Sequence, residues 1–254
     1  MSALIFFNNI YYHTLVATIM NIHITNLKKS FGETTACNIP AFHIQSGEIL
    51  GMVGNNGAGK TTLFRLMLDL IKADEGMVSF GDVNPAESEE WKKNTGAYID
   101  ESFLIDFLTP DEYFSFIGRV SNIDKATLDE RLSHFERFMN GELIQNNKLI
   151  RDLSAGNKQK VGIVAALLNR PQLVILDEPF NYLDPSGQSM LKKLLQEYNT
   201  TTGATVIVSS HNLSHTIDIS SRIVLLEHGC IIKDLPNDNG SASEILTEYF
   251  DSMS

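Results

Sequence analysis

Apolar positions along this chain follow two periods, and the periods alternate. Continuous apolar runs, typical of strands buried on both faces of a parallel sheet, occur at residues 49–53, 173–176, 204–209 and 222–227. Shorter strands are predicted at residues 22–27, 41–45 and 76–80. Apolar residues at helical spacing lie between them, at residues 63–71, 161–168 and after 184–185, and a polar helix is predicted at 86–93. This alternation predicts an α/β fold with an open, mostly parallel sheet whose ligand lies at the carboxyl ends of the strands.

The middle of the chain changes to helices alone. Residues 109–112 form a capping box with proline at the first helical position, and Tyr113, Phe116, Ile117 and Val120 follow at helical spacing. A further helix places Leu128, Leu132, Phe135 and Met139 on one face. We therefore expect a helical subdomain inserted at about residues 102–160, and a helical tail at about residues 236–254.

A glycine-rich loop follows the first buried strand and opens a helix. Residues 54–61 fit Gly-x-x-x-x-Gly-Lys-[Ser/Thr], the phosphate-binding loop of nucleotide hydrolases. Its glycines let backbone N–H groups turn onto phosphate oxygens, and the helix presents its positive end to the same anion. Lys60 then reaches the β- and γ-phosphates, while the Thr61 hydroxyl ligates Mg²⁺. The predicted nucleotide-binding residues are Gly54, Asn55, Asn56, Gly57, Ala58, Gly59, Lys60, Thr61 and Thr62.

Chemically active residues also follow two other buried strands. Asp177 and Glu178 come directly after strand 173–176, where adjacent carboxylates are costly unless a cation or a reaction uses them. We expect Asp177 to hold Mg²⁺ with Thr61, and Glu178 to polarise the water that attacks the γ-phosphorus. A solvated strand end is the alternative. His211 follows strand 204–209, and from its position alone it is more often structural than a donor to the γ-phosphate.

Composition narrows the partners of this site. The 254 residues carry a formal net charge of −11, which argues against a nucleic-acid surface. Cys37 and Cys230 are the only cysteines and have no metal-like spacing, which suits a reducing cytosol. No stretch approaches the roughly eighteen apolar residues of a spanning helix. We interpret residues 1–19 as an extension of uncertain status, either the product of a mis-chosen start codon or an amphipathic membrane contact.

One further segment distinguishes between families of nucleotide hydrolases. Leu153-Ser154-Ala155-Gly156-Asn157, here called the signature segment, lies between the phosphate loop and Asp177. With these motifs in this order, followed by Asp184 and His211, the chain resembles the ATP-binding-cassette (ABC) ATPases over about residues 20–235. The resemblance implies a P-loop NTPase fold of the ABC type. Such a fold has a mostly parallel sheet with helices on both faces, an antiparallel β edge, and an inserted α-helical subdomain that carries a Leu-Ser-Gly-Gly-Gln signature.

The resemblance also implies a head-to-tail dimer, formed with a second copy or with a different nucleotide-binding chain. Each ATP would lie between residues 54–62 of one subunit and residues 154–157 of the other. The physics agrees, since a hydroxyl, backbone N–H groups and a helix dipole at a helix start can face a phosphate. By the same resemblance, Phe31 stacks on adenine, Asp184 lies at the dimer seam, and His211 is the switch histidine on the γ-phosphate.

Several positions depart from the family pattern. Ala155 and Asn157 are mild changes from glycine and glutamine. More consequential is Asp100, which occupies the position of a glutamine that normally contacts Mg²⁺ and the attacking water. A carboxylate about 6 Å from a γ-phosphate oxygen repels each unit charge by roughly 3 kcal/mol at an effective dielectric near 20. Asp100 must therefore ligate the metal or turn away, and we expect ligation.

The resemblance leads to a functional hypothesis. We interpret the chain as the cytosolic ATPase subunit of a transporter, held at the inner face of the cell membrane by a separate transmembrane permease. ATP binding closes the dimer and hydrolysis opens it. Residues 103–105 and Phe107 either line a groove for the permease or belong to the core. Exporters of the drug, lantibiotic or ABC-2 kind match better than importers.

Two other classes of protein share parts of this pattern. A soluble ABC ATPase that remodels a protein complex, as in iron–sulfur cluster assembly, is the alternative function. A kinase with the same phosphate loop does not explain residues 153–157.

Overall fold

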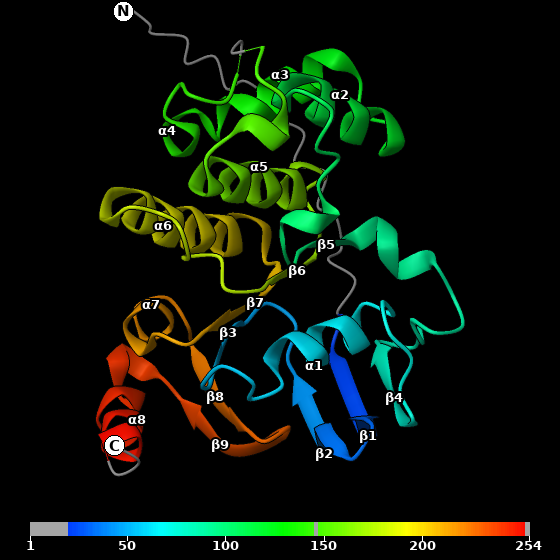
Figure 1. Cartoon of the computed structure of the whole chain (residues 1–254), viewed down its shortest axis with the longest axis vertical. Coiled ribbons are helices and arrows are strands. Elements are labelled where there is room, and N and C mark those ends of the chain that lie inside the picture. Colours follow the sequence, from blue (N-terminus) through cyan, green and yellow to red (C-terminus); the bar gives the residue numbers. More distant parts are fainter. Residues whose placement is uncertain (1–19, 145–146, 252–254) are drawn as a thin grey trace, which may run out of the picture.

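Two sheets and a group of helices make up residues 20–144 and 147–251, the part of the chain that this computed structural model describes (Figure 1). One sheet has six strands in the order β5-β6-β7-β3-β8-β9, and the other has three in the order β2-β1-β4. The strands are β1 (Ile22–Phe31), β2 (Thr34–Ile44), β3 (Ile49–Val53), β4 (Glu75–Phe80), β5 (Thr95–Tyr98), β6 (Leu173–Leu176), β7 (Thr205–Ser210), β8 (Arg222–Glu227) and β9 (Cys230–Pro236).

Except for a short helix at Leu213–Ile217, which was not predicted, the α-helices occur in segments predicted to be helical. They are α1 (Lys60–Met67), α2 (Pro110–Val120), α3 (Lys125–Ser133), α4 (Glu136–Met139), α5 (Ala155–Leu168), α6 (Pro185–Thr202), α7 (Leu213–Ile217) and α8 (Ala242–Asp251). Short 3₁₀ turns occur at η1 (Glu90–Asn94), η2 (Glu101–Phe103), η3 (Ile150–Asp152) and η4 (Asp238–Gly240). In the large sheet every pair of neighbours is parallel except β8 and β9, and the small sheet is antiparallel. The predicted α/β class is confirmed.

Both faces of the large sheet are buried. Its central strands send alternate side chains to opposite sides, and the side chains on each side belong to a separate core cluster. In β6, Leu173 and Ile175 join the cluster that contains α1, whereas Val174 and Leu176 join the cluster that contains α5 and α6. Helix α1 lies between the two sheets and buries Leu63, Phe64 and Met67 there. This double burial explains why the strand sequences are continuously apolar.

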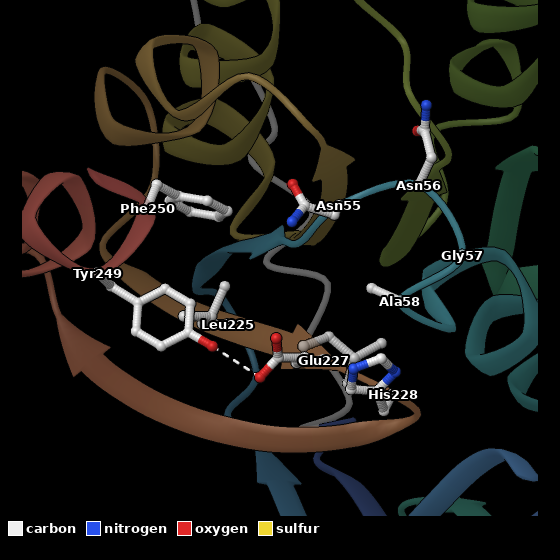
Figure 2. Close-up of a pocket in the computed structure, with 10 residues that line it drawn as sticks. Asn55, Asn56, Gly57, Ala58, Leu225, Glu227, His228, Tyr249 and Phe250 are labelled. Atoms are coloured by element: carbon white, nitrogen blue, oxygen red, sulfur yellow. Dashed lines mark hydrogen bonds between the residues drawn. The ribbon is translucent and has the colours of Figure 1, made fainter. Parts of the chain in front are cut away.

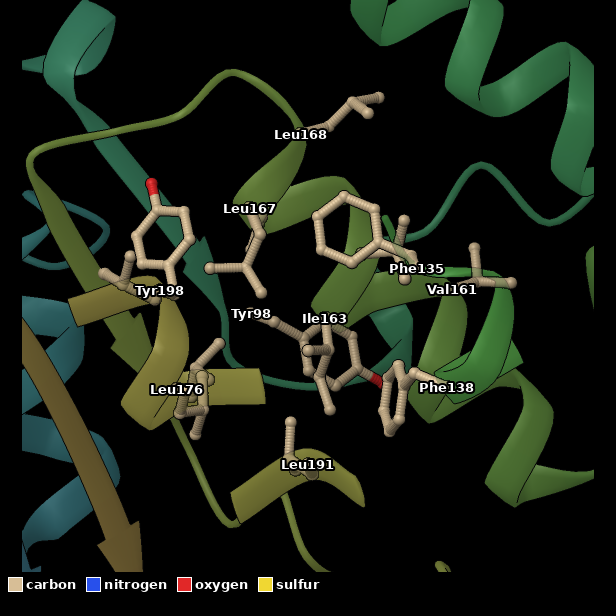
Figure 3. Close-up of a cluster of buried hydrophobic side chains, with 14 of the residues drawn as sticks. Tyr98, Phe135, Phe138, Val161, Ile163, Leu167, Leu168, Leu176, Leu191 and Tyr198 are labelled. Carbon is tan, nitrogen blue, oxygen red and sulfur yellow. The ribbon is translucent and has the colours of Figure 1, made fainter. Parts of the chain in front are cut away.

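Helices α2, α3 and α4 form one end of the molecule, and α5 lies between them and the sheet (Figure 1). Their core is shown in Figure 3, where Phe135 and Phe138 face Ile163 of α5. The predicted capping box opens α2: the Thr109 hydroxyl accepts from the Glu112 N–H at 3.3 Å, and the Glu112 carboxylate accepts from the Thr109 N–H at 2.8 Å. The limits predicted for the helical subdomain and for the tail stay predictions, and the extension at residues 1–19 lies outside the described residues.

Some predicted elements were wrong or missing. The polar helix at residues 86–93 is instead a turn followed by η1, because the Asn84 side chain accepts from the Ala86 N–H at 3.0 Å and the segment buries only Trp91. The helix drawn through Leu128 and Met139 is two helices, α3 and α4. Strands β5 and β9 were not predicted.

Candidate active site

The site lies where four neighbouring parallel strands end. β5, β6, β7 and β3 are adjacent in the large sheet, so the residues that follow them meet at one edge. Asp100 follows β5, Asp177 and Glu178 follow β6, His211 follows β7, and the phosphate loop follows β3. The topology therefore brings together motifs that are far apart in the sequence.

The phosphate loop turns from β3 into α1 through two residues in the left-handed region. Gly57 has φ 84° and Gly59 has φ 105°, values that favour glycine. Gly59 is also packed closely, since an added Cβ would lie 2.5 Å from the Ala36 carbonyl oxygen. Lys60 Nζ donates to the carbonyl oxygens of Gly54 at 2.6 Å and Asn55 at 3.3 Å. The ammonium group is thus held inside the loop that we expect to bind phosphate.

Asp177 is a buried carboxylate fixed by two hydroxyl groups. Thr61 Oγ1 donates to Asp177 Oδ2, and Ser209 Oγ donates to Asp177 Oδ1. Burial raises the pKa of Asp177, and the hydrogen bonds from Ser209 and Thr61 oppose that shift. The two residues predicted to share Mg²⁺ are therefore in direct contact.

Glu178 divides its carboxylate between Lys60 and His211. Its Oε1 lies 3.3 Å from Lys60 Nζ, and its Oε2 accepts from His211 Nδ1 at 2.9 Å and from the His211 N–H at 3.2 Å. The backbone of Glu178 has φ 46°, a left-handed value that is costly for a residue with a side chain. Its N–H donates to Ser209 Oγ at 2.8 Å, and its carbonyl accepts from Gln159 Nε2 at 3.2 Å. These two bonds hold the unusual backbone in place.

Asp100 lines the same cavity, but its carboxylate is engaged elsewhere. The cavity has a volume of about 520 Å³ and is lined also by Thr61, Asp177 and Glu178. Asp100 Oδ2 accepts from Arg65 Nη2 at 3.2 Å, and Oδ1 accepts from the N–H and the hydroxyl of Ser102. Burial opposes ionisation, but these hydrogen bonds lower the pKa of Asp100 below its usual value. The ligation of Mg²⁺ by Asp100 stays a prediction.

The remaining predicted residues lie at the margins of this cluster. Phe31 ends β1 with 54% exposure, and Lys29 Nζ lies 5.6 Å from its ring centroid. Ser154 caps α5 by accepting from the Asn157 N–H at 3.2 Å, and it is exposed. Asp184 caps α6 by accepting from the Gly187 N–H at 2.7 Å. Their roles in stacking on adenine and in a dimer stay predictions.

A comparison with known protein families assigns the chain. The family model described as "ABC transporter" matches residues 37–181. The chain belongs to the ABC transporter family. It is an ATP-binding and ATP-hydrolysing subunit of that family, as the resemblance implied. ATP binding is therefore a property of this subunit, and its placement at the phosphate loop stays a prediction.

Relatives and solved structures agree with this assignment. The chain is 32% identical to the bacitracin transport ATP-binding protein BcrA of Enterococcus faecalis, over 84% of this chain and 68% of that protein. It is 30% identical to the lantibiotic transport ATP-binding protein SrtF of Streptococcus pyogenes, over 91% and 96%. A solved ATP-binding subunit of an ABC transporter superimposes with a TM-score of 0.79 at 24% identity, over 91% of this chain and 98% of that one. A dimeric cassette bound to ADP and Pi gives a TM-score of 0.76 at 23% identity, over 86% and 99%.

The oxygen donors of this ABC ATPase subunit suit Mg²⁺. A threonine hydroxyl and an aspartate carboxylate in contact are ligands that Mg²⁺ uses together with substrate phosphates. Within residues 20–144 and 147–251, no group of three or more His, Cys, Asp or Glu side chains is placed to hold a metal ion. Among the same residues, no helix has the length and apolar character required to cross a membrane.

A second cavity lies between the phosphate loop, the end of β8 and α8 (Figure 2). It has a volume of about 210 Å³, and residues 55–58 and 225–228 line it together with Tyr249 and Phe250 of α8. The Tyr249 hydroxyl donates to Glu227 Oε2 at 2.6 Å. The C-terminal helix therefore supports the strand that lies beside the phosphate loop.

Three residues that hydrogen-bond to Asp100, Asp177 or Glu178 were not identified from the sequence. Ser209 and Gln159 are buried polar residues, and both bond to Glu178 or Asp177. Arg65 lies one helical turn beyond Thr61 on α1, and this spacing is the one signal that could have identified it.

Proposed function

We propose that this ABC ATPase subunit drives a separate transmembrane permease through ATP-dependent closing and opening of a dimer. The observation that carries the proposal is the meeting of the phosphate loop, Asp177, Glu178 and His211 at one edge of the sheet. Ser154, by contrast, is exposed at the start of α5. Such an exposed cap is free to face a nucleotide on a second subunit.

Each residue has a proposed role in hydrolysis. Lys60 leaves the loop carbonyls and binds β- and γ-phosphate oxygens. Thr61 and Asp177 would hold Mg²⁺, with Asp100 as a further oxygen ligand, and the ion would supply positive charge that offsets the charge on the phosphates. Glu178 orients the attacking water and takes its proton, while His211 moves from Glu178 to the γ-phosphate. Phe31 stacks on the adenine.

The dimer completes the site in this proposal. The signature segment, residues 153–157, of one subunit contacts the triphosphate bound by the other, and Asp184 lies at the seam between them. Charge on the phosphates draws the two surfaces together, since the N-terminus of α5 carries the positive end of a helix dipole. The second subunit is a copy of this chain or a related cassette.

A conservative variant tests this cycle. Glu178→Gln keeps the size of the side chain but removes the base, so hydrolysis is expected to fall by about 10² or more while ATP still binds. Size-exclusion chromatography with ATP and Mg²⁺ should then show a dimer that wild type does not accumulate. Glu75→Gln, which removes a carboxylate paired with exposed Lys28, is the matched control and should behave as wild type. A Glu178→Gln variant that hydrolyses ATP normally would refute the assigned base.

The permease contact has a candidate surface on the helical lobe. A groove of about 760 Å³ runs over α2 and the preceding turn, and its lining includes Ile105, Phe107 and Phe116. Phe107 is 65% exposed and lines this groove, Phe103 is 48% exposed but lies outside it, and Leu104 is buried in the core. We propose that a helix of the permease lies in this groove and holds the subunit at the inner face of the membrane.

Co-purification from detergent-solubilised membranes separates this function from its rival. A retained membrane protein that is lost on Phe107→Glu supports transport. A complex that forms entirely without membrane protein supports the alternative, a soluble ATPase that remodels a protein assembly. The relatives named for bacitracin and lantibiotic transport favour an exporter, although a sulfate/thiosulfate import protein is also 29% identical.

A further inference from the structure

Two consecutive carboxylates after β5 point to different lobes of the molecule. Asp100 pairs with Arg65 of α1, with 3.2 Å between Oδ2 and Nη2. Glu101 pairs with Lys158 of α5, with 3.0 Å between Oε2 and Nζ. The turn at Asp100 and Glu101 therefore forms ion pairs with both α1, which follows the phosphate loop, and α5, which follows the signature serine.

Arg65 also stands at a defined place relative to the metal site. Thr61 and Arg65 are four residues apart on α1, so they lie on the same face, about 6 Å apart along the helix axis. Asp100 lines the cavity with Thr61 yet bonds to Arg65. The guanidinium group thus holds the carboxylate one turn away from the hydroxyl that we expect to ligate Mg²⁺.

The charges explain why such a partner is needed. An unpaired carboxylate beside the cavity would repel the phosphates of ATP, as worked out above for Asp100. Paired with Arg65, it is part of a neutral unit. The Ser102 N–H and hydroxyl fix the other carboxylate oxygen, so the geometry of the turn is set from both sides.

We propose that Arg65 is a positioning residue that holds Asp100 against α1, so that the turn at Asp100 and Glu101 couples the phosphate-loop helix to the start of α5. The proposal depends on the proposed function only for its ligand, ATP. It assigns a role to Arg65 and Lys158 whether or not Asp100 later reaches the metal.

The decisive measurement is the affinity for ATP with Mg²⁺ chelated, obtained by equilibrium titration of the purified full-length chain. Arg65→Gln leaves Asp100 uncompensated, and we expect ATP to bind about threefold to tenfold more weakly. Arg65→Gln combined with Asp100→Asn is expected to restore affinity to within about twofold of wild type, and Arg65→Lys to retain most of it. Lys125→Gln, which removes a lysine paired with Asp129 on α3, is the control for net charge and should change nothing.

Hydrogen exchange in the nucleotide-free protein tests the mechanical part independently. Arg65→Gln should raise exchange of the amides at residues 101–104 and 155–158 by about threefold or more. In a Glu101→Gln background its effect on residues 155–158 should disappear, because the second ion pair is already broken.

Three results would overturn the proposal. The first is normal ATP affinity of Arg65→Gln without Mg²⁺. The second is a double variant that binds ATP as weakly as Arg65→Gln alone, and the third is unchanged exchange at residues 101–104 and 155–158 in Arg65→Gln. A wild-type protein that fails to bind ATP would instead contradict the proposed function, and the exchange result would still decide the role of Arg65.

Discussion

Gly162 marks a close approach between α5 and the large sheet, and replacing it should have a measurable cost. A Cβ at this position would lie 2.1 Å from Tyr98 Cε2, 2.2 Å from Cδ2 and 2.7 Å from Cζ. The Tyr98 ring is buried at 4% exposure in the cluster of Figure 3, and burial also raises the pKa of its hydroxyl. The ring cannot swing into solvent, so the helix or the strand must shift.

The expected magnitude is a balance of two effects. Alanine in place of glycine favours a helix by about 1 kcal/mol, whereas overpacking a core costs about 1–3 kcal/mol. With an overlap of this size, Gly162→Ala should lower the free energy of unfolding by about 1–2 kcal/mol. For a chain of this length, that corresponds to a fall in Tm of about 2–8 °C.

A matched glycine-to-alanine change makes the assay specific. Gly118 is also inside a helix, but its added Cβ would lie 3.1 Å from Leu128 Cδ2, the end of a flexible side chain. Gly118→Ala should be neutral or up to about 1 kcal/mol more stable than wild type. Both variants are compared by denaturant and thermal unfolding. Adding Tyr98→Ala removes the clash, so the double variant should lose less than the sum of the two single losses. Gly162→Ala at or above wild-type stability would refute the close packing.

Two further predictions concern single side chains. Burial, with a smaller contribution from Cys230, raises the pKa of the Cys37 thiol to about 12. A thiol reagent at pH 8 should therefore label Cys230 in the folded protein and Cys37 only after unfolding. Equal labelling rates of the two cysteines in the folded protein would contradict the burial of Cys37. Ser209→Ala removes a hydrogen bond that lowers the pKa of Asp177, and should cost about 1–2 kcal/mol of stability at neutral pH. Because the pKa of Asp177 is raised in the folded protein, its protonated carboxyl group stabilises the fold at acid pH, and this contribution is lost as pH rises through that pKa. The cost of Ser209→Ala should therefore shrink toward pH 4. An equal cost at neutral pH and at pH 4 would show that Asp177 is not involved.

The sequence predicts the buried strands well because their signal is local. The apolar runs at Ile49–Val53, Leu173–Leu176 and Arg222–Glu227 match β3, β6 and β8 residue for residue. By contrast, β5 is four residues long and is defined by its pairing with β6. Strand β9 is a largely exposed edge that ends in proline, so no periodic apolar pattern marks it.

The site divides in a similar way. The phosphate loop, Asp177 and Glu178 carry their chemistry in the local sequence and could be located before the fold was known. The partners of these residues could not, because they come from other elements. Asp100 was recognised as unusual, but its partner Arg65 is set by how the turn after β5 meets α1 and not by any motif. An ion pair between distant segments has no signature in one sequence.

Glu178, the proposed catalytic base, is held by residues from both lobes. A left-handed backbone costs about 1–3 kcal/mol for a residue with a side chain, so it persists only where its surroundings hold it. Here Ser209 of β7 binds the N–H, while Gln159 of α5 binds the carbonyl. Because α5 begins with the signature segment, a displacement of that helix pulls on the peptide that carries the proposed base. The position of Glu178 therefore depends on the helical lobe as well as on the sheet, and in the proposed mechanism a contact at the start of α5 would alter hydrolysis.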